Sequence, residues 1–86
     1  MLEKRDFYIG GRWVAPSAPQ DLEVIDPSTE EPCAVISLGS EADTDAAVDA
    51  ARVAFDGWAA TPPEERIACV ERILEIYGRR AGDMAE

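Results

Sequence analysis

The run Thr61-Pro62-Pro63-Glu64 separates two segments in the second half of the chain, and both segments have the residue spacing of an amphipathic helix. Proline is harmless at the first position of a helix, because its missing N–H would have no partner there. We therefore expect a helix to begin at Pro62, with Thr61 as its N-cap and Glu64 closing a capping box. Residues 40–86 are predicted to form two helices.

The first of these helices is expected to start near Glu41. Ser40 precedes it, and Asp43 follows three positions later, which is a capping-box arrangement with Asp in place of the usual Glu. Acidic residues in the first turn also suit the positive end of the helix dipole. Spacings of three and four then predict one buried face. This face consists of Ala47, Val48, Ala51, Ala54, Phe55 and Trp58.

The second helix has two apolar rows, so two neighbours are needed to cover it. One row consists of Ile67, Val70, Leu74, Tyr77, Ala81 and Met84, and the other of Cys69, Ile73 and Ile76. The pattern continues through Gly78 and Gly82, and Ala85-Glu86 reads as the middle of a helix. Because no helix-stop signal appears, we expect the chain to be a piece of something longer.

Residues 1–39 are expected to form β-hairpins. Gly10-Gly11 lies between two short β-prone runs, and two glycines supply the positive φ angles of a tight turn. A second hairpin is predicted from strands at 22–26 and 33–38, joined by a turn at 27–32. The predicted fold class is therefore α+β, with β-hairpins in 1–39 followed by two antiparallel-type helices in 40–86.

Composition excludes several partners. The chain has 8 Lys+Arg against 18 Asp+Glu, a net charge of -10, whereas phosphate binding needs clustered basic residues. Nucleic acid and anionic membrane are therefore not expected. No apolar run approaches the roughly 18 residues of a membrane span, and residues 1–6 begin no secretory apolar stretch, so we expect a cytoplasmic protein. At 86 residues, an independent core would be marginal.

The sequence offers no catalytic, cofactor-binding or metal-ligating residue. It has no histidine, and Cys33 and Cys69 belong to no CxxC pattern, so both are expected to be reduced, small, buried residues. Gly10-Gly11 could approach a phosphate, but no helix start follows it, which favours the hairpin turn. Trp13 and Trp58 could stack on a ligand, although packing in the core is the more usual role.

Four blocks, taken in order, resemble the N-terminus of the NAD(P)-dependent aldehyde dehydrogenases. They are Ile9-Gly10-Gly11-Arg12-Trp13, Asp26-Pro27-Ser28-Thr29-Glu30-Glu31, the helix 47–58 with the pattern A-V-x-A-A-R-x-A-F-x-x-W, and Pro62-Pro63-Glu64-Glu65-Arg66. The resemblance covers essentially the whole chain. One departure is Glu30, which replaces the glycine common in that turn of the family.

The resemblance implies a parent enzyme that oxidises an aldehyde to a carboxylic acid with NAD or NADP, through a nucleophilic cysteine and a glutamate base. All of these parts lie downstream of the matched region in the family, so no catalytic, cofactor or metal residue is assigned here and the catalytic domain is absent. Some relatives hold a monovalent cation through main-chain oxygens at positions matching Val24 and Ile25, but any such site would be at best partial, and none is assigned.

The resemblance thus implies that residues 1–86 form the N-terminal part of a Rossmann-like coenzyme-binding domain and act as scaffold. The expected partners are the remainder of the parent chain and further copies in a homo-oligomer. The isolated chain is expected to be inactive and to bind no cofactor. The alternative is a free-standing acidic helical module for protein interaction, which should cap its last helix and cover its apolar stripes.

Overall fold

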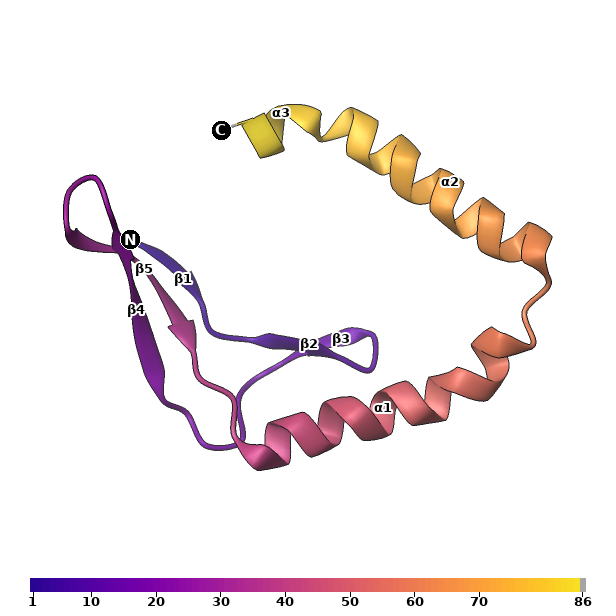
Figure 1. The fold of residues 1–86 in the computed structure, drawn as a ribbon, viewed down its shortest axis with the longest axis horizontal. Coiled ribbons are helices and arrows are strands. Elements are labelled where there is room, and N and C mark those ends of the chain that lie inside the picture. The colour runs from indigo at the N-terminus through magenta and orange to yellow at the C-terminus, as the bar shows by residue number, and fades with distance from the viewer. Residues whose placement is uncertain (86) are drawn as a thin grey trace. The chain divides into compact units, whose positions relative to one another are not determined.

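The computed structural model describes residues 1–85. The chain divides into two compact units, an N-terminal unit, Met1–Ala54, and a helical unit, Phe55–Glu86. Strands and the greater part of the first helix belong to the N-terminal unit, and the remaining helices belong to the helical unit (Figure 1). The α+β class predicted from the sequence is confirmed.

Five strands lie in the N-terminal unit. They are β1 (Leu2–Lys4), β2 (Phe7–Ile9), β3 (Arg12–Val14), β4 (Asp21–Asp26) and β5 (Glu31–Ser37). One sheet has the order β1-β5-β4, and the other pairs β2 with β3. Both predicted hairpins are present, since β2–β3 and β4–β5 are antiparallel. The parallel pairing of β1 with β5 was not predicted from the sequence.

The β2–β3 turn has the backbone geometry that its glycines predict. Gly10 has φ 63° and Gly11 has φ 81°, both in the left-handed region that glycine adopts without a Cβ clash. Tyr8 pairs with Trp13 across the hairpin, and their ring centroids lie 5.1 Å apart. Such an aromatic cross-strand pair stabilises a short ribbon.

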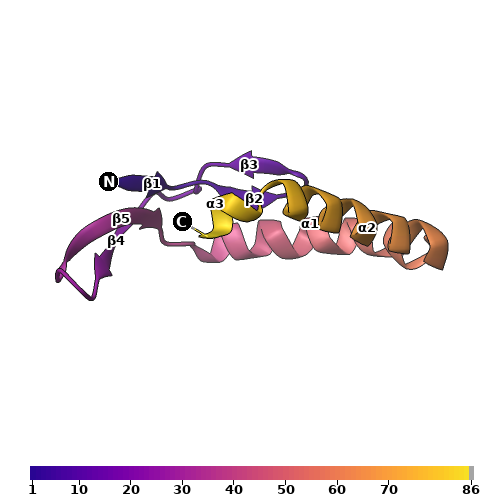
Figure 2. The same ribbon diagram turned by 90° about the horizontal axis from the view of Figure 1, so that it is seen from above.

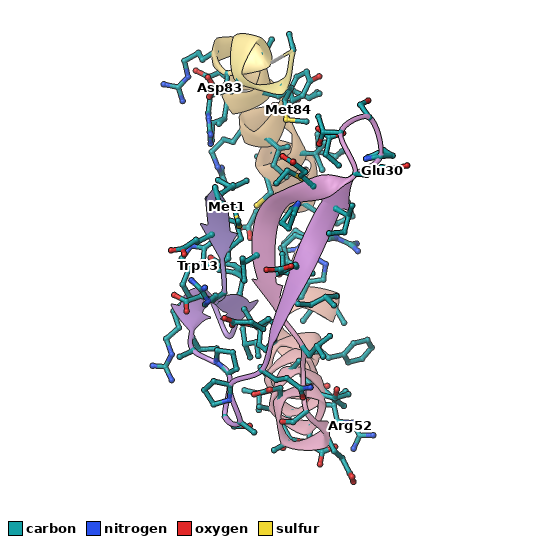
Figure 3. The ribbon with its side chains drawn as sticks, turned by 90° about the vertical axis from the view of Figure 1, so that its left-hand side faces the viewer. Met1, Trp13, Glu30, Arg52, Asp83 and Met84 are labelled. Carbon is teal, nitrogen blue, oxygen red and sulfur yellow. The ribbon has the colours of Figure 1, made fainter. Side chains whose placement is uncertain are left out.

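The β4–β5 turn is tighter than the sequence suggested. Ser28 donates its N–H to Asp26 Oδ1 at 2.8 Å, and Glu30 donates its N–H to the Asp26 carbonyl at 2.7 Å. Glu30 itself has φ 61°, a left-handed conformation at a residue with a side chain. Figure 3 shows Glu30 where this turn meets β5.

The second strand of this hairpin begins earlier than predicted. β5 starts at Glu31 rather than at residue 33, and Pro32 pairs with Ile25 next to a register shift between Val24 and Ile25. Proline is tolerated in a sheet at such a bulge, where one ladder hydrogen bond is already missing.

The first helix, α1, spans Glu41–Ala59, and its predicted start is confirmed. Ser40 donates its N–H to Asp43 Oδ2 at 3.0 Å, and Asp43 donates its N–H to Ser40 Oγ at 3.3 Å. These reciprocal bonds form a capping box in which Asp replaces Glu.

The second helix, α2, spans Pro63–Arg79, so the predicted start at Pro62 is one residue early. Pro62 is the N-cap residue, with φ -57° and ψ 145°, because a proline at the next position disfavours helical geometry at the residue before it. The predicted Thr61 cap is also wrong. The Thr61 hydroxyl instead donates to the Gly57 carbonyl at 2.9 Å, at the end of α1.

The predicted continuous helix to Met84 is interrupted. α2 ends at Arg79, Arg80 adopts φ -111° and ψ 14°, and a short helix, α3, spans Ala81–Ala85. The Arg80 N–H donates to the carbonyls of both Ile76 and Tyr77, which tightens the last turn. Gly78 and Gly82 flank the break, and each lowers the local helix propensity. Residue 86 lies outside the described residues.

Candidate functional site

The described residues hold no constellation typical of catalysis. Within residues 1–85, no group of three or more His, Cys, Asp or Glu side chains is placed to bind a metal ion. Cys33 is exposed and donates from Sγ to the Val24 carbonyl at 3.5 Å, while the half-buried Cys69 accepts from Arg72 Nη2 at 3.0 Å. The prediction that Cys33 is buried is wrong, because the first three residues of β5 are all exposed.

No helix in residues 1–85 has the length and apolarity to cross a bilayer.

Asp43 links the start of α1 to a distant loop. Its Oδ1 accepts the N–H of Ser17 at 3.0 Å, and its Oδ2 accepts both the N–H and the hydroxyl of Ser40 at 3.0 Å. The Ser17 and Ser40 hydroxyls also lie 3.0 Å apart. The backbone N–H bonds from Ser40 and Ser17 hold the pKa of the Asp43 carboxyl below its ordinary value. Sequence reasoning found the Ser40 contact but missed Ser17, which lies in a proline-containing loop with no local signal for it.

The Gly10-Gly11 turn lies against the side of α1, not at its end. A Cβ added at Gly10 would lie 3.9 Å from Ala50 Cβ, in ordinary van der Waals contact with an alanine-rich part of the helix. Figure 2 shows the β2–β3 hairpin along this helix. A phosphate cradle requires glycines at a helix N-terminus. The hairpin interpretation of these glycines is therefore confirmed.

Exposed apolar side chains are the main feature of the surface. Val35, with 8% of its surface exposed, is the single buried apolar residue within 1–85. Trp13, Phe55 and Trp58 are exposed, which contradicts the expectation that the tryptophans lie in a core. Figure 3 shows Trp13 projecting outward from the N-terminal unit. A chain that leaves this much apolar surface in water is suited to being covered by other protein.

The helical unit has two such surfaces. The first groove has a volume of about 530 Å³ and is lined by Pro63, Arg66, Ile67, Val70, Glu71 and Leu74. The second has a volume of about 310 Å³ and is lined by Ile73, Ile76, Tyr77, Arg80, Asp83 and Met84. The first groove contains Ile67, Val70 and Leu74 of the first predicted row. The second groove combines Ile73 and Ile76 of the second row with Tyr77 and Met84 of the first, so the grooves do not separate the two rows.

Comparison with known proteins identifies the family. The sequence pattern of the "Aldehyde dehydrogenase family" matches residues 13–86. The chain belongs to the aldehyde dehydrogenase family. It is similar to a crystal structure of aldehyde dehydrogenase from Bartonella henselae, with a TM-score of 0.93 and 62% identity over 99% of this chain and 18% of that one.

Two relatives found by comparing sequences show the same relationship. The chain is 41% identical, over its full 86 residues, to a 3-succinoylsemialdehyde-pyridine dehydrogenase from a Pseudomonas species. It is 37% identical over 79 residues to a putative aldehyde dehydrogenase from Staphylococcus aureus. The chain spans 18% and 17% of the length of these two relatives.

Proposed function

We propose that this chain is the N-terminal scaffold segment of an NAD(P)-dependent enzyme that oxidises an aldehyde to a carboxylic acid. The observation that carries the proposal is the exposed apolar surface, with Val35 alone buried among residues 1–85, in a chain that matches less than a fifth of a known dehydrogenase. The remainder of the parent chain would cover this surface, and assembly into a homo-oligomer in the cytoplasm belongs to the same proposal.

The described residues do not fit a dinucleotide themselves. A pyrophosphate needs free N–H groups at a helix N-terminus. At the start of α1 the carboxylate of Asp43 occupies that position, and α2 begins with Pro63, Glu64 and Glu65. The carboxylates at the N-termini of α1 and α2 would therefore repel an anionic ligand. The cofactor, the nucleophile and the general base of the proposed reaction are therefore assigned to the remainder of the parent enzyme.

A hybrid dehydrogenase tests the proposal. In it, this chain replaces the matching segment of the Bartonella henselae enzyme, to which it is 62% identical. We expect a folded, soluble hybrid that reduces NAD or NADP when an aldehyde is added. A control hybrid in which the same segment is a flexible Gly/Ser linker should be insoluble or inactive, because the apolar surfaces facing the segment would lose their cover.

Two results would contradict the scaffold assignment. One is a hybrid that fails to fold although the native Bartonella henselae enzyme, prepared in parallel, is active. The other is an isolated 86-residue chain that is a compact monomer and captures a different protein with high affinity, as a free-standing interaction module would.

A further inference from the structure

The first groove of α2 contains a buried donor atom for which residues 1–85 supply no acceptor. Arg66 lines this groove together with Pro63 and Ile67. Its Nε atom is buried and has no hydrogen-bond acceptor anywhere in residues 1–85. A buried donor without an acceptor destabilises a protein, so native structures pair such groups almost without exception.

The position of Arg66 in the helix indicates that the missing acceptor carries a negative charge. Arg66 is the fourth residue of α2, close to the positive end of the helix dipole, where a cation is unfavourable. Glu64 and Glu65 lie in the same turn, but neither accepts a hydrogen bond from the buried Nε. A carboxylate from outside the described residues would offset both the unpaired donor and the unfavourable dipole.

We infer that this groove is the docking site for an apolar segment of the parent dehydrogenase that presents a carboxylate to Arg66. Ile67, Val70 and Leu74 form the apolar floor against which that segment packs. The occupant belongs to the same polypeptide, because this chain spans 18% of the length of a relative, so most of the parent polypeptide is available to cover the groove. The inference rests on the proposed function.

The hybrid dehydrogenase provides the test, with three variants of α2. Arg66→Met removes the guanidinium and keeps the apolar stem, and Arg66→Lys keeps the charge without the Nε donor. Arg72→Met is the matched control, since Arg72 is exposed in the middle of the same helix and the bond it loses is to the Cys69 sulfur, a weak acceptor. We expect Arg66→Met to lower the melting temperature by at least roughly 2 °C. Arg66→Lys should lower it less, and Arg72→Met should leave it unchanged.

A photo-cross-link identifies the occupant. With p-benzoylphenylalanine in place of Val70, we expect a cross-link to another part of the same polypeptide, at a segment that contains Asp or Glu. A mixture of isotope-labelled and unlabelled hybrid separates links within one chain from links between copies. Removing the mapped carboxylate should then produce the same loss as Arg66→Met, and the two changes together should add little.

Each other outcome overturns the inference. Equal melting temperatures for Arg66→Met and Arg72→Met would show that the buried Nε needs no external acceptor. A cross-link found solely between two copies would assign the groove to an oligomer contact, and a mapped segment without a carboxylate would remove the proposed partner. If Arg66→Met does not fold, the cross-link still decides. A hybrid that is inactive before any substitution contradicts the proposed function. An active hybrid whose melting temperature does not change with Arg66→Met contradicts this inference alone.

Discussion

The backbone N–H of Ser17 donates to the carboxylate of Asp43 at 3.0 Å, across 26 positions of the sequence. This bond, together with the 3.0 Å contact between the Ser17 and Ser40 hydroxyls, ties the loop between β3 and β4 to the start of α1. Because Asp43 also accepts from Ser40, one ionised side chain holds the loop, the residue before the helix and the helix start in one arrangement.

Asp43→Asn is expected to destabilise the hybrid dehydrogenase near neutral pH. The amide offers one acceptor oxygen where the carboxylate offers two, so a bond to Ser17 or to Ser40 is lost. The folded state lowers the pKa of Asp43 from 3.8, so its contribution is complete above that value and is lost as the pH falls through the lower, folded value. Thermal unfolding of both proteins should therefore show a difference that disappears in acid. A difference that grows as the pH falls would contradict this role.

Glu30→Gly is expected to stabilise the protein. Glu30 has φ 61°, a conformation that costs a residue with a Cβ about 1 kcal/mol, and glycine adopts it freely. The greater freedom of glycine in the unfolded chain offsets part of this gain. The matched control is Glu31→Gly, one position later in β5, which should destabilise by roughly 0.5–1 kcal/mol. Denaturant unfolding of the hybrid measures both, and equal losses would show that the turn carries no strain.

Gly10→Val is expected to lower the thermal stability of the hybrid and to leave its KM for NAD or NADP unchanged. A β-branched residue at φ 63° costs about 1 kcal/mol or more, whereas Gly10→Asn should be tolerated better because asparagine adopts left-handed geometry. A Cβ at Gly10 would lie 3.9 Å from Ala50 Cβ, and the hairpin is scaffold in the proposed enzyme. A loss of cofactor affinity at an unchanged melting temperature would show instead that the turn binds phosphate.

The isolated chain is expected to be loosely packed or self-associated and to bind neither NAD nor NADP. Its apolar residues are exposed almost throughout, and burial of that surface is what stabilises a fold. Calorimetric titration should therefore show no cofactor binding, and amide NMR signals should be broad or poorly dispersed. Sharp, dispersed signals from a monomer, or micromolar binding of NAD, would contradict these expectations.

Elements whose partners are close in sequence could be predicted from the residue pattern. The turn at Gly10-Gly11 follows from the conformational freedom of glycine, and the capping box of Ser40 and Asp43 follows from chemistry three residues apart. The start of α2 was predicted one residue early, although the reason is also local, since Pro63 acts on the residue before it. The α+β class and the family resemblance follow from the same short-range signals.

Features that depend on distant residues could not be predicted in this way. Strand β1 exists because Leu2–Lys4 pairs with β5, about thirty positions away, and its own three residues have no strand pattern that marks it. The Ser17–Asp43 bond and the unpaired Nε of Arg66 are likewise visible only once the chain is folded. Local propensity selects turns and helix ends because their energies involve neighbouring residues, whereas pairing, burial and satisfaction of polar groups depend on which surfaces the whole fold brings together.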